Sequence, residues 1–159
     1  MQKLNLVKAI VRYNPSINPS EKFRYGNGKD GSSTRYLLLQ KAIDAYFPEN
    51  IGKWECIGGI IKPKGTSIET ITRKITEETG LKKEKFQITK QLPTLRMTDK
   101  DYDSHCDVYL IDVSSMNVIL SPEHSDYNWS KIEDIKIRPL VLYANLLLEF
   151  FNNPEKYLI

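Results

Sequence analysis

Two adjacent carboxylates, Glu77 and Glu78, are the residues of this chain whose types and spacing most directly indicate chemistry. They stand near the end of a predicted helix. Thr66, followed three residues later by Glu69, fits a capping box at its start, and Gly80 fits the left-handed residue that ends a helix. Two acids late in a short helix can hold a cation if at least one of them is turned away from bulk water.

The apolar residues of this helix place Glu78 in an unusual position. Ile68, Ile71 and Ile75 recur at intervals of three and four, which predicts one buried face. At about 100° per residue, Glu78 falls beside that face, and Glu77 lies further round the same side. A carboxylate there is costly unless it is satisfied, and a divalent cation satisfies it because hard cations take carboxylate oxygens. The alternative is a solvated acid pair near the end of the helix.

Strands and a last helix are predicted around this helix. The short strand Lys53–Ile57 leads into Gly58 and Gly59, whose backbone can turn sharply and present a carbonyl or amides to a ligand. The other predicted strands are Leu4–Tyr13, Arg35–Ala42, Phe86–Leu95 and Cys106–Val113.

The C-terminal part is predicted to be helical. A helical turn is expected at Ile132–Ile135, and a last helix is expected to open at Arg138-Pro139-Leu140, with the proline in its first turn. Its apolar positions at helical spacing are Leu140, Tyr143, Leu146, Leu147 and Phe150. We expect this helix to pack on the sheet.

The stretch from Gly58 to Leu81 resembles the Nudix box of the Nudix hydrolases. The matching positions are Gly59, Arg73, Ile75, Glu77, Glu78, Gly80 and Leu81. The sequence departs from the box at Gly65, where the family has its first glutamate, and at Lys74, where it has the glutamate after the arginine. The preceding Trp54–Ile57 is similar to the segment that often leads into the box, although Ile57 replaces a proline.

This resemblance implies an α+β fold, an α/β/α sandwich with a mixed sheet between helices, in one domain over residues 1–159. It implies Mg²⁺-dependent, or Mn²⁺-dependent, attack of water on the diphosphate linkage of a nucleoside polyphosphate or a related nucleoside diphosphate derivative. The alternative is a catalytically weak or silent module of the same fold that binds a nucleotide or a partner protein without cleaving it.

The resemblance also assigns metal ligands. Glu77, Glu78 and the Gly58 carbonyl would hold the metal, with waters filling its coordination shell. The later stretch Ser121–Trp129 is similar to a family segment in which a loop acid reaches the metal site. Glu123 is therefore a candidate to hold a second metal or to accept a proton from water.

Three further positions of the box bear on activity. Arg73 would orient the acids or pair with one of them, and Gly65 removes a carboxylate that would be its structural partner. Lys74 is the i,i+4 neighbour of Glu78, so its ammonium could neutralise a metal ligand. It could instead stand in for a cation and bind a phosphate of the substrate, and Gly59 is a second candidate for substrate binding. The acid pair favours an enzyme, whereas Lys74 favours the silent module.

Length and composition set broader limits. With 159 residues, 40% hydrophobic and 27% charged, the chain suits one ordinary globular domain, and a net charge of +3 is too small to indicate a nucleic-acid surface. We find neither a signal-like N-terminus nor an apolar run of about 18 residues. We therefore expect a cytoplasmic protein with a small nucleotide-type substrate and with no membrane or nucleic-acid partner. Cys56 and Cys106 are expected to be reduced core residues, because no catalytic cysteine motif surrounds them.

Two polar stretches are expected to choose the substrate. The insertion at residues 14–34, Asn14–Thr34, is either a solvated loop or a lid that contacts a base or phosphates. Met97–His105 is predicted to be an acidic loop, and its alternating aspartates lack the glycine and the closing glutamate of a calcium loop. His105 could bind a ligand, although a lone histidine at a strand start is more often structural.

Overall fold

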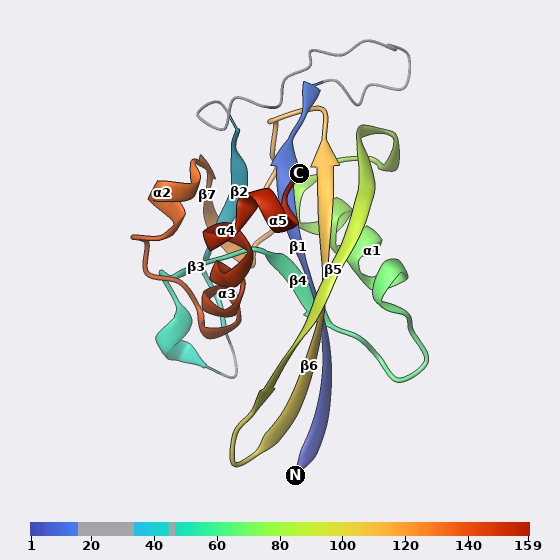
Figure 1. The fold of residues 1–159 in the computed structure, drawn as a ribbon, viewed down its shortest axis with the longest axis vertical. Coiled ribbons are helices and arrows are strands. Elements are labelled where there is room, and N and C mark those ends of the chain that lie inside the picture. The colour runs from blue at the N-terminus through green and yellow to red at the C-terminus, as the bar shows by residue number, and fades with distance from the viewer. Residues whose placement is uncertain (16–33, 45–46) are drawn as a thin grey trace.

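The fold is known from a computed structural model that describes residues 1–15, 34–44 and 47–159. Its centre is a mixed sheet of seven strands (Figure 1). The strands are β1 (Gln2–Tyr13), β2 (Tyr36–Lys41), β3 (Trp54–Glu55), β4 (Ile57–Ile60), β5 (Phe86–Thr98), β6 (Tyr102–Val113) and β7 (His124–Ser130). The helices are α1 (Ser67–Thr79), α2 (Ile132–Ile135), α3 (Leu142–Leu146), α4 (Leu148–Asn152) and α5 (Pro154–Tyr157), with 3₁₀ turns at Pro48–Asn50 and Lys83–Lys85.

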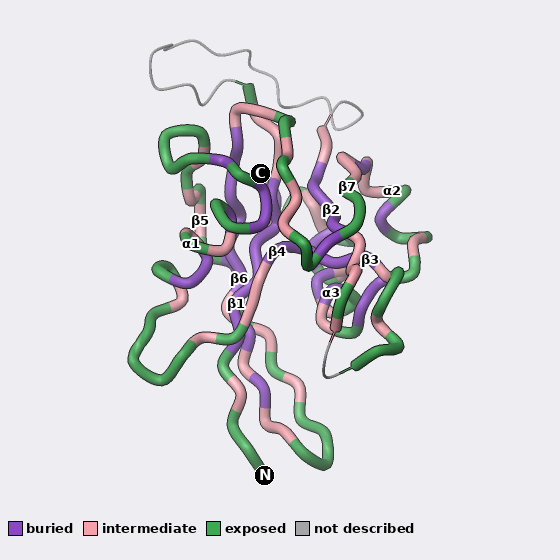
Figure 2. Tube along the Cα trace, turned by 180° about the vertical axis from the view of Figure 1, so that it is seen from behind, coloured by how far each residue is buried: buried purple, intermediate pink, exposed green. Residues whose placement is uncertain are grey.

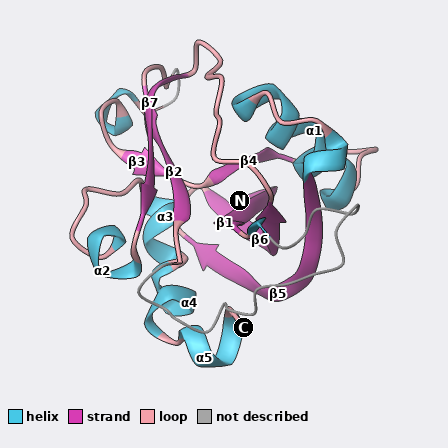
Figure 3. Ribbon diagram, turned by 90° about the horizontal axis from the view of Figure 1, so that it is seen from above, coloured by secondary structure: helices cyan, strands magenta, loops and turns pink. Residues whose placement is uncertain are grey.

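The strand order explains the mixed character of the sheet. The main path runs β3-β2-β1-β6-β5, with β4 paired to β1 and β7 paired to β2. Strands β1 and β6 are parallel along their whole length, whereas the other pairs are antiparallel. Helix α1 lies on one side of the sheet, and α3, α4 and α5 lie on the other (Figure 3). This arrangement confirms the predicted α+β sandwich.

Alternate side chains of β1 belong to two separate hydrophobic cores. Leu6 and Ile10 join the cluster that contains Phe150 of α4. Val7 joins the cluster that contains Ile75 of α1. Successive residues of a strand point to opposite faces, so the central strand is buried by helices on both sides. Figure 2 shows the resulting band of buried residues through the middle of the molecule.

Helix α1 begins and ends where its capping residues predict. The Thr66 side chain accepts a hydrogen bond from the Glu69 N–H at 3.1 Å, and Gly80 closes the helix with a φ of 75°. The predicted apolar face was wrong at one position: Ile71 and Ile75 are fully buried, but Ile68 is 51% exposed. Helical periodicity predicts a face but not which turns of that face the sheet covers.

The predicted loop Met97–His105 is instead the end of a long hairpin. Strand β5 continues to Thr98 and β6 starts at Tyr102, so only the residues between them turn. The Asp99 carboxylate accepts hydrogen bonds from two backbone N–H groups of the turn, at 2.8 and 2.7 Å. The residues look loop-like in sequence because this end of the hairpin extends past the core into solvent (Figure 2). The other polar stretch, the predicted insertion at 14–34, falls almost wholly outside the described residues.

The C-terminal helix was predicted to start too early and to be continuous. Leu140 pairs with Trp54 of β3 as an isolated bridge, which holds the backbone extended until α3 begins. The chain then forms three short helices with breaks at Leu147 and Asn153. The helical turn at Ile132–Ile135 was predicted correctly.

The structure also describes the two cysteines and the lengths of the helices. Cys56 and Cys106 are free and buried, as predicted. Within the described ranges, none of the helices is long and apolar enough to cross a membrane.

Candidate active site

Glu78 is the buried acid of the predicted pair. It lies in the last turn of α1 and is 3% exposed, because the face that carries Ile71 and Ile75 turns it toward the sheet. Its Oε2 atom is buried and has no hydrogen-bond partner among the described residues. An unpaired carboxylate oxygen in such a place is costly, which marks it as a position that a ligand would satisfy.

Glu123 and His124 lie against Glu78. One carboxylate oxygen of Glu78, one of Glu123 and one ring nitrogen of His124 all lie within 4.8 Å of one another. Glu123 is exposed, at the rim, while His124 is buried as the first residue of β7. The Glu123 carbonyl accepts a hydrogen bond from the Ala42 N–H at 2.8 Å, which ties this segment to the end of β2. The three side chains have the types and spacing of a cation site.

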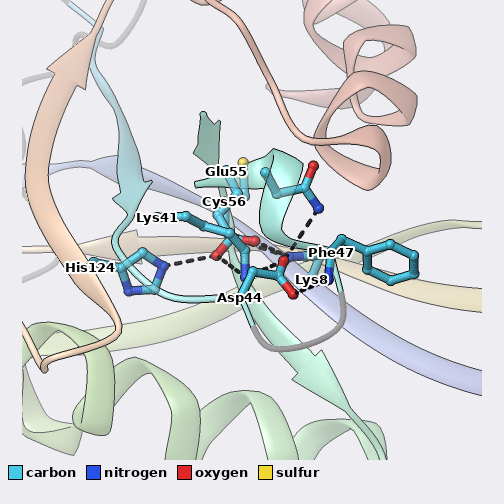
Figure 4. A network of polar contacts seen from close by, with 8 residues as sticks. Lys8, Lys41, Asp44, Phe47, Glu55, Cys56 and His124 are labelled. Carbon is cyan, nitrogen blue, oxygen red and sulfur yellow. Dashed lines mark hydrogen bonds and ion pairs between the residues drawn. The ribbon is translucent and has the colours of Figure 1, made fainter. Parts of the chain in front are cut away.

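A buried network of charges lies behind this cluster, and Figure 4 shows it. The Glu55 carboxylate accepts a hydrogen bond from Lys8 Nζ at 3.0 Å, lies 2.8 Å from His124 Nε2 and forms an ion pair with Lys41 at 3.4 Å. Burial alone would raise the pKa of Glu55, but Lys8, His124 and Lys41 outweigh it and hold that pKa well below its usual range. Lys8 also donates to the Cys56 carbonyl at 3.2 Å.

The two buried glutamates have opposite electrostatic environments. Burial raises the pKa of Glu78 to about 7, against smaller opposing effects of His124 and Lys8. Glu55 has direct cationic partners and Glu78 has none within hydrogen-bond distance in the described chain. The network therefore satisfies Glu55 completely and leaves Glu78 available.

Glu77 is not brought into the same cluster. Its side chain is 48% exposed, and both of its oxygens accept hydrogen bonds from Arg73 Nη1, at 2.9 and 3.1 Å. The pair borders a surface groove that also contains Ile68, Thr72 and Lys83. Arg73 thus pairs with one of the acids, one of the two arrangements expected from the sequence, and the role of Glu77 as a metal ligand stays a prediction.

Lys74 lies over the double glycine. A Cβ added to Gly59 would come within 2.8 Å of Lys74 Cε and 3.5 Å of its Nζ. Within the described ranges, no carboxylate pairs with the Lys74 ammonium, although its charge acts on Glu78 from a distance. A side chain at position 58 would be tolerated less well than one at position 59, since a Cβ there would lie 2.3 Å from the Val7 carbonyl oxygen. Glycine at 58 is what allows β4 to pair closely with β1.

Sequence reasoning did not assign a role to three residues of this site, His124, Glu55 and Lys8. One signal was available: Lys8 interrupts an apolar strand, and a buried lysine requires a buried acid. His105, which was considered as a ligand, lies on β6 with its Nε2 3.7 Å from an Asp103 oxygen and does not join the cluster around Glu78.

Comparison with known proteins identifies the family. Residues 27–149 match the NUDIX domain family. The chain belongs to the Nudix family. It is 34% identical over 113 residues to the nucleoside triphosphatase NudI of Klebsiella pneumoniae (strain 342), a match that covers 64% of this chain and 76% of that protein.

Solved structures share the Nudix fold at lower sequence identity. A MutT protein from Methanosarcina mazei Go1 superposes with a TM-score of 0.69 at 22% identity, over 98% of this chain and 96% of that one. An Ap4A hydrolase from C. elegans, solved as a binary complex, gives a TM-score of 0.67 at 20% identity, over 97% and 99% of the two chains.

Proposed function

We propose that this Nudix protein hydrolyses the diphosphate linkage of a nucleoside polyphosphate or a related nucleoside diphosphate derivative, with the help of a divalent cation, Mg²⁺ or Mn²⁺. The observation that carries the proposal is the buried, unpartnered carboxylate oxygen of Glu78 beside Glu123 and His124. A helix surface with no ligand to bind would not be expected to retain an acid in that position.

The residues present fit a hard cation. Glu78 and Glu123 supply oxygen ligands, and the Gly58 carbonyl remains a predicted third. A divalent ion held there supplies Lewis-acid chemistry, since it neutralises phosphate charge and lowers the pKa of water. Glu77 remains a predicted ligand whose carboxylate is shared with Arg73.

The chain's own side chains would complete the reaction. The exposed carboxylate of Glu123, at the rim of the cluster, can accept a proton from an attacking water. The Lys74 ammonium, beside Gly59, can bind a phosphate oxygen as a compact positive charge. Burial of Glu78 and His124 excludes water from the inner side of the site.

The proposed substrate class is supported by what related proteins are called. The curated relative is a nucleoside triphosphatase, and one structural neighbour is an Ap4A hydrolase. Both descriptions name compounds that contain phosphoanhydride bonds. We therefore propose a nucleotide-type substrate without naming the base or the leaving group.

A second candidate function is nucleotide binding without turnover. It is favoured by the ion pair between Glu77 and Arg73 and by Lys74, which together leave fewer free carboxylates than the family motif has. In that case Lys74 would take the place of a cation, and the bound nucleotide would remain intact.

The test is a hydrolysis assay on a panel of nucleoside triphosphates, dinucleoside polyphosphates and nucleotide sugars with millimolar Mg²⁺ or Mn²⁺. We expect release of pyrophosphate or monophosphate that falls by about 100-fold or more in Glu78→Gln. Glu84→Gln, which changes an exposed glutamate in the 3₁₀ turn before β5, is the matched control and should be unchanged. Binding of a nucleotide without turnover of any panel member would favour the second candidate.

A further inference from the structure

The ring of His124 has one bonded and one unbonded nitrogen, and both lie inside the protein. His124 is 5% exposed, and its Nε2 lies 2.8 Å from a Glu55 oxygen (Figure 4). Its Nδ1 is buried and has no partner within the described residues. A nitrogen of this ring also belongs to the cluster with Glu78 and Glu123.

The contacts of Glu55 indicate which nitrogen of this ring it binds. Glu55 is surrounded by Lys8 at 3.0 Å and Lys41 at 3.4 Å, so its carboxylate is ionised and can only accept hydrogen bonds. At 2.8 Å from this carboxylate, Nε2 is the ring nitrogen placed to donate a hydrogen bond to Glu55. Nδ1 is then the ring nitrogen that remains for a ligand.

The unsatisfied atoms belong to neighbouring side chains. Glu78 Oε2 and His124 Nδ1 are both buried without a hydrogen-bond partner in the part of the chain that the structure describes, and their side chains belong to the same cluster. One cation in that cluster can satisfy both an unpartnered carboxylate oxygen and an unpartnered ring nitrogen.

We propose that His124 is a nitrogen ligand of the cation site, that Glu55 is the positioning residue that orients its ring, and that the site therefore takes a Mn²⁺- or Co²⁺-type cation in preference to Mg²⁺. The inference rests on the cation site of the proposed function and adds to it the class of ion. Imidazole binds first-row transition metals well, whereas Mg²⁺ strongly prefers oxygen ligands.

The replacement at Lys74 is consistent with this change of ligand. The family motif has a carboxylate at that position, and here the Lys74 side chain lies over Gly59 instead. His124 offers the cluster a ring nitrogen in addition to its carboxylates. A carboxylate that holds a histidine against a metal is a recurrent arrangement, and loss of such a partner typically weakens metal binding 10- to 100-fold.

Titration calorimetry with the metal ions alone tests the inference on the full chain. We expect Mn²⁺ and Co²⁺ to bind at least about tenfold more tightly than Mg²⁺. His124→Gln should remove that preference and change Mg²⁺ affinity much less, and Glu55→Gln should weaken Mn²⁺ binding by about tenfold or more. The chain has two histidines, so His105→Gln is a matched control that should behave as wild type.

A measurement on the unmodified protein tests the inference even if the variants do not fold. In ¹⁵N spectra of the two histidine rings, His124 should carry its proton on Nε2, and adding diamagnetic Zn²⁺ should shift Nδ1 of His124 and leave His105 unchanged. A proton on Nδ1, or a Mn²⁺-to-Mg²⁺ affinity ratio that survives His124→Gln, would overturn the inference.

The two proposals fail in distinguishable ways. Mg²⁺-dependent hydrolysis that requires Glu78 but not His124 would overturn this inference and leave the proposed function standing. Absence of binding by any divalent ion would overturn both.

Discussion

Glu55 and His124, 69 positions apart in the chain, are joined by a 2.8 Å contact between the second residue of β3 and the first residue of β7. Neither strand pairs with the other, because β2 lies between them. The Glu55 carboxylate pairs with Lys8 and Lys41, and a ring nitrogen of His124 lies within 4.8 Å of carboxylate oxygens of Glu78 and Glu123. The sheet therefore separates a fully paired acid from an unpaired one.

Removing the charge of Glu78 should stabilise the metal-free protein. Burial raises the pKa of Glu78 to about 7, above its value in an unfolded chain, so stability falls as pH rises from about 4.5 to 7. At pH 8 with chelator, we expect Glu78→Gln to raise the free energy of unfolding by about 1–3 kcal/mol, measured by urea denaturation. Glu84→Gln should have no effect. A variant less stable than wild type at pH 8 would mean that the carboxylate has a partner in the apo protein.

Restoring an acid at position 74 should strengthen cation binding. The Lys74 ammonium lies beside Gly59, and its charge acts on Glu78. Lys74→Glu replaces a repulsive charge with an attractive one, so we expect the Kd for Mn²⁺ to fall by about tenfold, a change of roughly 1.4 kcal/mol. Lys100→Glu, in the turn between β5 and β6, makes the same change in net charge and should leave the Kd within about twofold. Unchanged or weaker binding in Lys74→Glu would contradict this account of the lysine.

The two box glycines should differ in their tolerance of a methyl group. At Gly58 a Cβ would lie 2.3 Å from the Val7 carbonyl oxygen, so the backbone pairing of β4 with β1 must shift. At Gly59 the nearest atoms belong to the flexible end of Lys74, which can move. We expect Gly58→Ala to cost about 2–4 kcal/mol in urea denaturation and Gly59→Ala about 1 kcal/mol or less. Equal losses would show that the close approach of β1 and β4 is not the constraint.

The two cysteines should be unreactive in the folded protein. Burial raises the pKa of Cys56 to about 12 and that of Cys106 to about 11. The thiolate is the reactive form, so an aromatic disulfide reagent at pH 8 should label neither thiol until urea unfolds the chain. Because both pKa values rise on folding, these thiols contribute stability below about pH 9 that is lost as pH rises further. Labelling of the native protein within minutes would contradict the buried positions.

Local signals in the sequence were sufficient for the box helix. A capping hydroxyl at Thr66 and a left-handed glycine at Gly80 act within a few residues, so they fix the ends of α1 whatever the rest of the chain does. The same local reasoning placed Glu77 and Glu78 on one side of the helix. It could not show that the sheet covers one and that Arg73 pairs with the other.

The part of the site that sequence reasoning missed depends on long-range pairing. Glu55, Lys8 and His124 come from three strands, and their meeting depends on the register of β1 with β4 and of β2 with β3 and β7. Strand pairing at such separations leaves little trace in local periodicity. The two misplaced boundaries have the same cause. At the β5–β6 hairpin, pairing between the strands extends a segment that looks like a loop in sequence, and at Leu140, pairing with Trp54 extends a segment that looks like a helix.

The most direct test of the account is the position of a bound ion. Crystals grown with Mn²⁺ should give an anomalous scattering peak bounded by Glu78, Glu123 and His124, and the peak should be absent in Glu78→Gln. A peak coordinated by Glu77 on the exposed side of α1 with none at Glu78, or no peak at millimolar Mn²⁺, would contradict the central claim.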